Sequence, residues 1–310
     1  MKKISIAGSC FNEADNVKTW YEKVTQTIKK FDNYTYEIVI SDNNSTDHTK
    51  EILTELAEKD ENLRVIFNLK NYGHIQSPHN SLKNTNGDII IFIATDLEDP
   101  PELIEQLINA HEKNHKELIL ATHPERDISF LGKISRLFVL KVVDYVTNMK
   151  QLRDFTGYFL MTKNFKEYVL SLGLNYPYYR GIITASGFEY DTVNYVKNKR
   201  PNGVSKTTFF DLVDMAILSV VSQSNHLLRI STIFAIFGIF LSTILFFVFF
   251  TLKIVYWENF SSGVVPVILL VLFLFSLVFL ILGIISEYIN HMIGKIAPSE
   301  AVIEKKKINF

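Results

Sequence analysis

Three groups of polar side chains in the first third of the chain have the types and spacing that nucleotide and metal chemistry requires. They are Asn12-Glu13, the run from Asp42 to Asp47, and the run from Asp96 to Glu102. Each group follows a short apolar segment and precedes a segment with helical periodicity. A single Asp or Asn in such a place is commonly a helix cap. Three groups in succession favour a shared ligand site.

Asp96 and Glu98 offer the hard oxygen ligands that divalent cations prefer. Mg²⁺ usually takes one or two protein carboxylates and completes its coordination with water and substrate phosphates. The chain contains no GxGxxG or Walker A loop, which disfavours a dinucleotide dehydrogenase or a P-loop enzyme. The sequence therefore predicts a nucleoside diphosphate that is held through a metal ion.

The elements that must position these groups alternate between strands and helices up to about residue 125. Short apolar segments predict strands at 4–7, 36–40, 63–67, 88–94 and 117–121. Helical stretches between them cover roughly 14–31, 47–60, 76–85 and 101–115. This alternation predicts an α/β domain with a mostly parallel sheet. Ligands bind outside the carboxyl ends of the strands in such sheets.

Two later segments, 230–252 and 264–286, contain 23 residues each and no charged residue. A helix of about 20 apolar residues crosses a bilayer, so the two segments predict a transmembrane hairpin. Arg229, Lys295 and the run Lys305-Lys306-Lys307 flank this hairpin on one side. The positive-inside bias then predicts that the N-terminal domain and the C-terminal tail are cytoplasmic.

The overall composition excludes several classes of protein. The chain has 32 Lys+Arg against 33 Asp+Glu, for a net charge of −1, whereas a nucleic-acid-binding protein normally has a basic excess. Cys10 is the single cysteine, which excludes an intrachain disulfide and a zinc site built from several cysteines. We therefore expect no nucleic-acid partner.

A longer series of motifs, in order along the chain, resembles the family 2 glycosyltransferases of the GT-A fold. The matching segments are 10–13, 42–47, 69–74, 86–88, 96–102, 154–157, 200–206 and 286–288. The chain is most similar to the membrane-anchored polyprenyl-phosphate glycosyltransferases, a group that includes dolichyl-phosphate mannose synthase and bacterial undecaprenyl-phosphate glucosyltransferases. The resemblance covers nearly the whole chain.

The resemblance implies a role for individual residues. The implied donor-binding residues are Asn12, Glu13, Asp42 and Lys70. The implied ligands of a Mg²⁺ or Mn²⁺ cofactor are Asp96 and Glu98, and the implied catalytic residues are Asp96 and Asp154. The implied acceptor-phosphate-binding residues are Arg180, Arg200, Ser205 and Lys206.

The resemblance also implies a domain organisation and an activity. A Rossmann-like GT-A domain is expected at 1–205, interfacial helix at 206–229, two membrane helices within 230–289, and a cytoplasmic tail at 290–310. The expected enzyme sits in the inner membrane and moves a sugar from a UDP- or GDP-sugar to undecaprenyl phosphate, with inversion, for surface glycan decoration. The resemblance also leaves open the formation of homo-oligomers through the membrane helices.

The chain departs from the family pattern at the metal motif. Ala94 stands where the family has an Asp two positions before Asp96, and Glu98 replaces a Gln. The second Asp of the early motif is Asn43, and Tyr158-Phe159-Leu160 lacks an expected basic residue. A non-catalytic, membrane-tethered protein that binds nucleotide sugars is therefore the alternative hypothesis.

The segment from His111 to His115 supplies a more remote alternative, because it matches the H-E-x-x-H pattern of zinc proteases. A membrane zinc protease would need both imidazoles on one face of a buried helix. The polar neighbours Lys113, Asn114 and Lys116 instead indicate the solvated end of a helix.

Overall fold

The computed structural model describes residues 1–124, 141, 152, 154–174, 177–198, 226–256, 264–296 and 302–310. The chain divides into two compact units. Unit 1 comprises Met1–Phe138, Met149–Leu212 and Pro298–Phe310, and unit 2 comprises Val139–Asn148 and Val213–Ala297.

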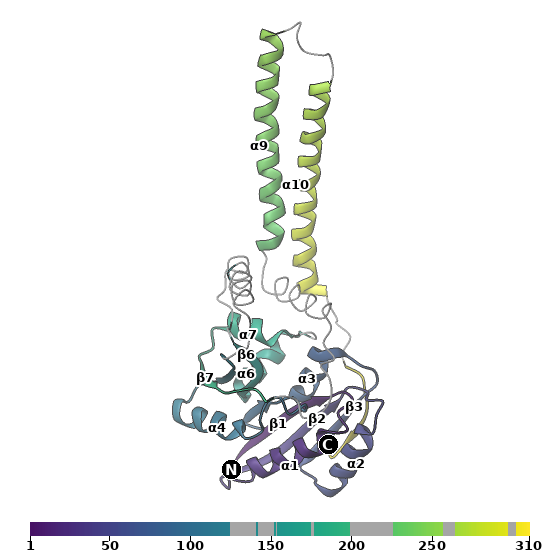
Figure 1. Cartoon of the computed structure of the whole chain (residues 1–310), viewed down its shortest axis with the longest axis vertical. Coiled ribbons are helices and arrows are strands. Elements are labelled where there is room, and N and C mark those ends of the chain that lie inside the picture. The colour runs from purple at the N-terminus through teal and green to yellow at the C-terminus, as the bar shows by residue number, and fades with distance from the viewer. Residues whose placement is uncertain are drawn as a thin grey trace. The chain divides into compact units, whose positions relative to one another are not determined.

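The described strands of unit 1 form one eight-stranded sheet in the order β7-β5-β6-β4-β1-β2-β3-β8 (Figure 1). They are β1 (Lys2–Cys10), β2 (Tyr34–Asp42), β3 (Leu63–Asn68), β4 (Ile89–Phe92), β5 (Leu118–Thr122), β6 (Phe155–Thr162), β7 (Tyr190–Asn194) and β8 (Glu304–Ile308). The central strands β4, β1, β2 and β3 run parallel to one another. Strands β6 and β8 are antiparallel to their neighbours. The expected α/β domain with a mostly parallel sheet is confirmed.

Helices cover both faces of this sheet. They are α1 (Val17–Ile28), α2 (Thr49–Lys59), α3 (Gly73–Lys83), α4 (Leu103–Asn114), α6 (Lys163–Ser171) and α7 (Tyr179–Ser186). Buried residues of α1, α2 and α4 join one hydrophobic cluster, and buried residues of α3, α6 and α7 join a second. In β4, Ile89 and Ile91 enter the first cluster and Ile90 the second. This alternation explains why the strand is apolar throughout.

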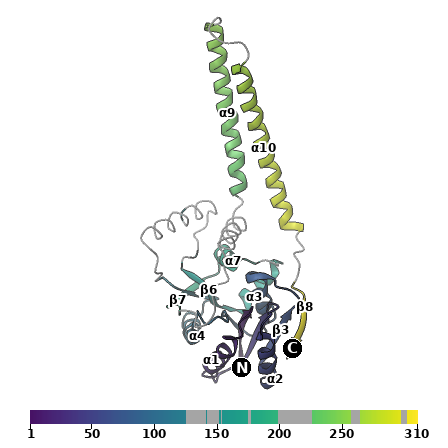
Figure 2. The ribbon, with the colours of Figure 1, turned by 45° about the vertical axis from the view of Figure 1, so that its right-hand side comes forward.

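The C-terminal segment differs from the expected tail. Residues Glu304–Ile308 form the edge strand β8, which pairs with β3. Its lysine-rich sequence is common in edge strands, where charged side chains prevent further strand pairing. Figure 2 shows β8 alongside β3, close to the C-terminus.

Unit 2 contains two long helices, α9 (His226–Val255) and α10 (Val264–Ile296), which lie side by side in Figures 1 and 2. They approach closely at Gly238, where an added Cβ would lie 2.7 Å from the Oγ atom of Ser276. Over the residues that are described, no helix combines the length and apolarity needed to cross a membrane, so the two expected spans gain no support there. Most of the expected interfacial helix, 206–225, lies outside the described residues.

Candidate active site

The three polar groups singled out in the sequence meet at one edge of the sheet. Strands β4, β1 and β2 are parallel neighbours, so the loops that follow them leave from the same edge. Asn12 and Glu13 follow β1, Asp42 ends β2, and Asp96 follows β4. This edge is the place where open α/β sheets bind ligands.

The loops after β1 and β2 are joined through Asn12. Its backbone N–H donates to the Ser45 hydroxyl at 2.9 Å, and its Oδ1 accepts from the Thr46 backbone N–H at 2.7 Å. Asn12 has a φ of 55°, in the left-handed region that Asn tolerates better than most residues. The loops after β1 and β2 are therefore connected by hydrogen bonds into one surface.

Glu13 lies beside this junction and is also fixed by its neighbours. Its backbone N–H donates to the Thr49 hydroxyl at 2.9 Å, and its Oε2 accepts from the Asn16 amide at 2.8 Å. Asp47 accepts from the Thr49 backbone N–H at 3.0 Å, at the first residue of α2, and from the Ala14 backbone N–H at 3.2 Å. The starts of α1 and α2 are thus held together.

Asp42 is a fully buried carboxylate at the end of β2. Its Oδ2 accepts from the Ser45 backbone N–H at 3.1 Å, and the Cys10 thiol lies 3.7 Å from Oδ1. Burial raises the pKa of Asp42, although the Ser45 contacts oppose the shift. Such a carboxylate is suited to accept a hydrogen bond from a polar ligand that binds at this edge of the sheet.

Lys70 lies on the loop after β3, which Asn43 ties to the loop after β2. The Lys70 Nζ atom is 5.1 Å from the ring centroid of Tyr72. Asn43 Oδ1 accepts from the Tyr72 backbone N–H at 2.8 Å, and Asn43 Nδ2 donates to Asn71 Oδ1 at 2.6 Å. An Asp at 43 could accept the first bond but could not donate the second. The departure at this position therefore has a structural reason.

The loop that carries Asp96 is compact and strained. Asp96 Oδ1 accepts from the backbone N–H of Glu98 at 3.2 Å, and the intervening Leu97 has a φ of 60°. A left-handed Leu costs roughly 1–2 kcal/mol, so the rest of the structure must hold this loop in place.

Lys197, which follows β7, supplies part of that support. Its Nζ atom lies 3.2 Å from Glu98 Oε2 and 3.5 Å from Asp99 Oδ1. The Tyr195 hydroxyl donates to Asp99, and the Asn198 backbone N–H donates to the Glu98 carbonyl at 2.9 Å. Burial lowers the pKa of Lys197, but the charges of Asp99 and Glu98 outweigh it and raise the pKa.

Sequence reasoning missed Lys197 and Tyr195. The available signal was their position just after a strand that ends at the same edge of the sheet as β4. That signal gave no indication of which charged partner each would meet.

The fit of these residues to a divalent cation can be judged from their partners. Asp96 provides a half-buried carboxylate at the expected position, whereas Glu98 forms an ion pair with Lys197. Among the described residues, no group of three or more His, Cys, Asp and Glu side chains forms a metal site by itself. The arrangement fits a cation that takes one carboxylate from the protein and most ligands from a diphosphate.

Asp154 lies at the same edge, because β6 begins beside the end of the antiparallel strand β4. It has a φ of 59°, and its carbonyl accepts from the His123 backbone N–H at 2.9 Å. Arg180, expected to bind acceptor phosphate, donates to the carbonyls of Leu152 at 3.3 Å and Phe155 at 2.5 Å. It therefore supports the turn that carries Asp154.

The remaining acceptor residues, Arg200, Ser205 and Lys206, lie outside the described residues. Their roles stay predictions from the sequence.

The zinc-protease alternative is wrong. Helix α4 ends at Asn114, and His115 is its left-handed C-cap with a φ of 51°. His111 Nδ1 lies 2.9 Å from the Lys116 carbonyl, and the Tyr34 hydroxyl donates to Glu112 Oε1 at 2.6 Å. His115 therefore lies beyond the last helical residue of α4, and the Glu112 carboxylate is engaged by Tyr34.

Comparisons with known proteins agree with this geometry. The chain is 26% identical to the bactoprenol glucosyl transferase of Shigella phage SfX, over 94% of each chain. It is 22% identical to the undecaprenyl-phosphate 4-deoxy-4-formamido-L-arabinose transferase of Photorhabdus laumondii, over 94% of this chain and 90% of that protein.

A solved structure, glucosyl-3-phosphoglycerate synthase from Mycobacterium tuberculosis with Mn²⁺ and UDP, matches 72% of this chain and 80% of its own. The TM-score is 0.51 at 19% identity, which shows a shared fold. The model of the family "Glycosyl transferase family 2" matches residues 5–168, more than half of the chain. The resemblance inferred from the motifs is thereby confirmed, and the chain is a glycosyltransferase that belongs to glycosyl transferase family 2.

Proposed function

We propose that this glycosyltransferase moves one sugar from a nucleotide-sugar donor to a polyprenyl phosphate. The observation that carries the proposal is the match, over 94% of the chain, to relatives whose names specify bactoprenol and undecaprenyl phosphate. Both are long isoprenoid lipids. The interlocked loops after β1, β2 and β3 supply the polar surface that a nucleotide requires.

In this proposal, different residues of unit 1 bind different parts of the donor. Asp42 and Asn12 contact the nucleoside, with Glu13 and Lys70 beside them. The buried carboxylate of Asp42 selects for a hydrogen-bond donor on the base. A bound Mg²⁺ or Mn²⁺ would supply positive charge to the departing diphosphate, with Asp96 as its protein ligand. Glu98 instead orders the loop through Lys197.

Transfer then requires little acid–base chemistry. An oxygen of the lipid phosphate attacks the anomeric carbon from the face opposite the leaving group. A carbon–oxygen bond forms, the bond to the nucleoside diphosphate breaks, and the configuration inverts. A phosphate monoester is largely ionised near neutral pH, since its second pKa is about 6. Asp154 therefore needs only to orient the acceptor or screen its approach.

In this proposal the acceptor phosphate is bound by Arg200, Ser205 and Lys206. They are assigned this role because of their sequence motif. A guanidinium group binds two phosphate oxygens in a fork, and an ammonium group adds a point charge. Arg180 contributes through the turn that it holds at Leu152 and Phe155.

A lipid acceptor calls for membrane attachment, which we assign to α9 and α10. Their support is the pair of uncharged segments in the sequence and the many large apolar side chains that both helices expose, including Phe237, Phe240, Phe247, Phe275 and Phe279. Large exposed apolar surfaces mark contact with lipid or protein. The basic flanks favour the inner membrane with unit 1 on the cytoplasmic side. The expected product would serve surface glycan decoration.

An acceptor comparison tests the proposal. Purified full-length protein in detergent receives a radiolabelled sugar nucleotide together with undecaprenyl phosphate or with soluble 3-phosphoglycerate. Label that enters the organic phase only with the lipid phosphate supports the proposal. Label transferred to 3-phosphoglycerate alone would assign the enzyme a soluble acceptor.

The alternative of a non-catalytic sugar-nucleotide-binding protein has one observation in its favour, the Ala94 departure from the metal motif. The same experiment separates the two. Saturable nucleotide binding with no transfer from any donor would favour the alternative.

A further inference from the structure

We propose that the C-terminal strand β8 positions the donor-binding loops, and that Tyr72 is the residue that connects the strand to them. The nature of the ligand rests on the proposed function. The connection itself rests on contacts among described residues of unit 1.

Asn309 and Phe310, the two residues that follow β8, fix the C-terminal end of the strand to the rest of unit 1. The side-chain amide of Asn309 donates to the carbonyls of Ala57 at 2.8 Å, Asp60 at 3.2 Å and Leu63 at 2.8 Å. The guanidinium carbon of Arg64 lies 4.0 Å from the ring centroid of Phe310. These contacts leave the end of the strand little freedom to detach.

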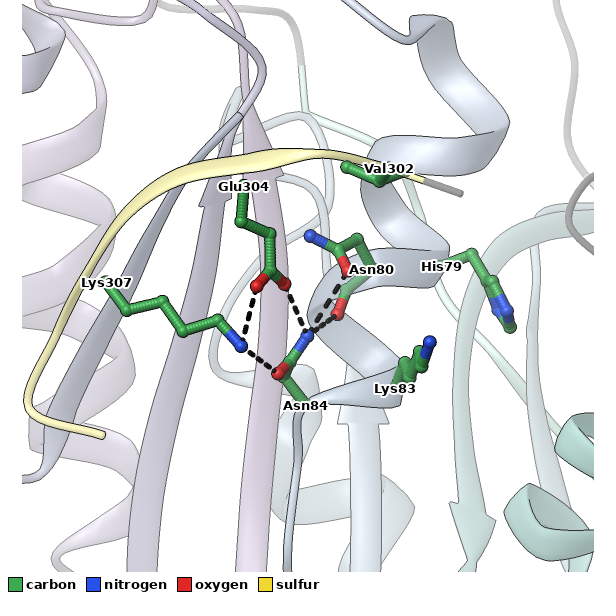
Figure 3. Close-up of a pocket in the computed structure, with 7 residues that line it drawn as sticks. All are labelled: His79, Asn80, Lys83, Asn84, Val302, Glu304 and Lys307. Atoms are coloured by element: carbon green, nitrogen blue, oxygen red, sulfur yellow. Dashed lines mark hydrogen bonds and ion pairs between the residues drawn. The ribbon is translucent and has the colours of Figure 1, made fainter. Parts of the chain in front are cut away.

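The middle of β8 is fixed to the end of α3. A pocket of about 200 Å³ separates the two elements and is lined by His79, Asn80, Lys83, Asn84, Val302, Glu304 and Lys307 (Figure 3). On one side of it, Asn84 donates to Glu304 at 3.1 Å, and Lys307 bonds both Glu304 at 2.7 Å and Asn84 at 2.8 Å (Figure 3). Strand β8 is therefore anchored to the helix that directly follows the Lys70 loop.

Ile303, the residue just before β8, holds the loop that follows β3 at two points. The backbone N–H of Ile303 donates to the Tyr72 hydroxyl at 3.1 Å. The Ile303 carbonyl accepts from the backbone N–H of Leu69 at 2.9 Å. One residue of the C-terminal segment thus clamps both ends of the loop 69–72, and Tyr72 is only 6% exposed.

Tyr72 passes this constraint on to the donor site. Its backbone N–H bonds Asn43, the neighbour of Asp42, and its ring lies beneath the Lys70 ammonium group. A shift of the Tyr72 ring would therefore displace Lys70 and loosen the loop that follows Asp42. Tyr72 acts through these two residues and is a positioning residue.

The substitution Tyr72→Phe removes the hydroxyl and keeps the buried ring. Because a neutral hydrogen bond contributes modestly, we expect the Kd for UDP or GDP with Mn²⁺ to rise about threefold to tenfold. The donor KM should rise in parallel, with kcat within about twofold of the wild type. Tyr34→Phe is the matched control, since its hydroxyl donates to Glu112 of α4 at 2.6 Å and contacts none of the described residues that anchor β8.

Amide hydrogen exchange supplies a readout that does not depend on turnover. We expect faster exchange in peptides covering 68–74 in Tyr72→Phe and no change there in Tyr34→Phe. Unchanged exchange would show that β8 does not hold the loop. Faster exchange with an unchanged nucleotide Kd would show that the loop is held without serving the donor site, and either result overturns the proposal. A wild type that binds nucleotide but transfers no sugar contradicts the proposed function alone.

Discussion

At the scale of single residues, the proposed donor site has a conflict between stability and binding at Asp42. The carboxylate is fully buried, and burial raises its pKa. The folded protein therefore binds this proton more tightly than the unfolded chain does. Stability falls as the pH rises through the interval between the unfolded and folded pKa values. At neutral pH the charge is therefore a net cost to folding, which the Ser45 contacts offset only in part.

The substitution Asp42→Asn should raise the melting temperature at pH 7, because it removes the buried charge and keeps an acceptor for Ser45. It should also weaken nucleotide binding by about tenfold or more, since hydrogen bonds to charged groups are the stronger ones. Thermal denaturation and calorimetry with UDP or GDP measure the two effects.

Asp47→Asn is the control with the opposite sign. Burial raises the pKa of Asp47, but the hydrogen bonds from Thr49 and Ala14 outweigh it and lower the pKa, so Asn should lower the melting temperature. An Asp42→Asn protein that is less stable than the wild type, or that binds nucleotide equally well, would contradict this account.

The sequence predicted which single residues lie at this edge of the sheet but not which partners they have. The types and order of Asn12, Asp42 and Asp96 were enough to place them at one sheet edge, because strand and helix periodicity determines where each loop emerges. The contact of Glu98 with Lys197 joins residues 99 positions apart. No local pattern encodes such a pairing.

At the scale of elements, Glu37 of β2 connects the neighbouring strands. It is 2% exposed, and its carboxylate accepts from Lys3 and Ser5 of β1 at 2.6 Å each and from Arg64 of β3 at 3.0 Å. Burial alone would raise the pKa of Glu37, but the hydrogen bonds from Lys3, Ser5 and the Asn86 backbone N–H, with the charge of Lys3, lower it. The stabilisation is fully present above the ordinary pKa of 4.5 and is lost as the pH falls through the lowered, folded value.

The substitution Glu37→Gln should cost about 3 kcal/mol at pH 7, because it leaves Lys3 and Arg64 without their buried counter-charge. The difference from the wild type should shrink as the pH falls below 4.5. Urea unfolding across this pH range measures it. Glu51→Gln, at an exposed contact 4.0 Å from the His48 ring, should change stability by less than about 1 kcal/mol. Equal effects of the two substitutions would show that the network is not a stabilising unit.

Strand β8 is an element that the sequence did not predict. Its three consecutive lysines indicated a charged tail beside a membrane. An exposed edge strand can have the same run of charged residues, so the sequence alone did not distinguish the two. Its partner β3 lies more than 200 residues earlier, as in the pairing of Val65 with Ile308. Only the folded chain brings these segments together.

At the scale of the whole molecule, the chain leaves unit 1, forms the paired helices of unit 2, and returns to unit 1 as β8. Unit 1 is therefore complete only when the segment after α10 has joined its sheet. The proposed function assigns nucleotide chemistry to unit 1 and membrane attachment to unit 2. Both assignments depend on a single activity, the transfer of sugar to a lipid phosphate.

The most direct measurement of that activity is a transfer assay with the full-length protein in detergent, undecaprenyl phosphate, and a panel of UDP- and GDP-sugars. We expect a lipid-linked sugar from one donor, in the presence of Mg²⁺ or Mn²⁺. Chelation should abolish the product, and so should Asp96→Ala, which should melt at the wild-type temperature. Product that persists after both treatments would contradict the role of Asp96 and the metal. Absence of lipid product from every donor, with nucleotide binding intact, would contradict the central claim.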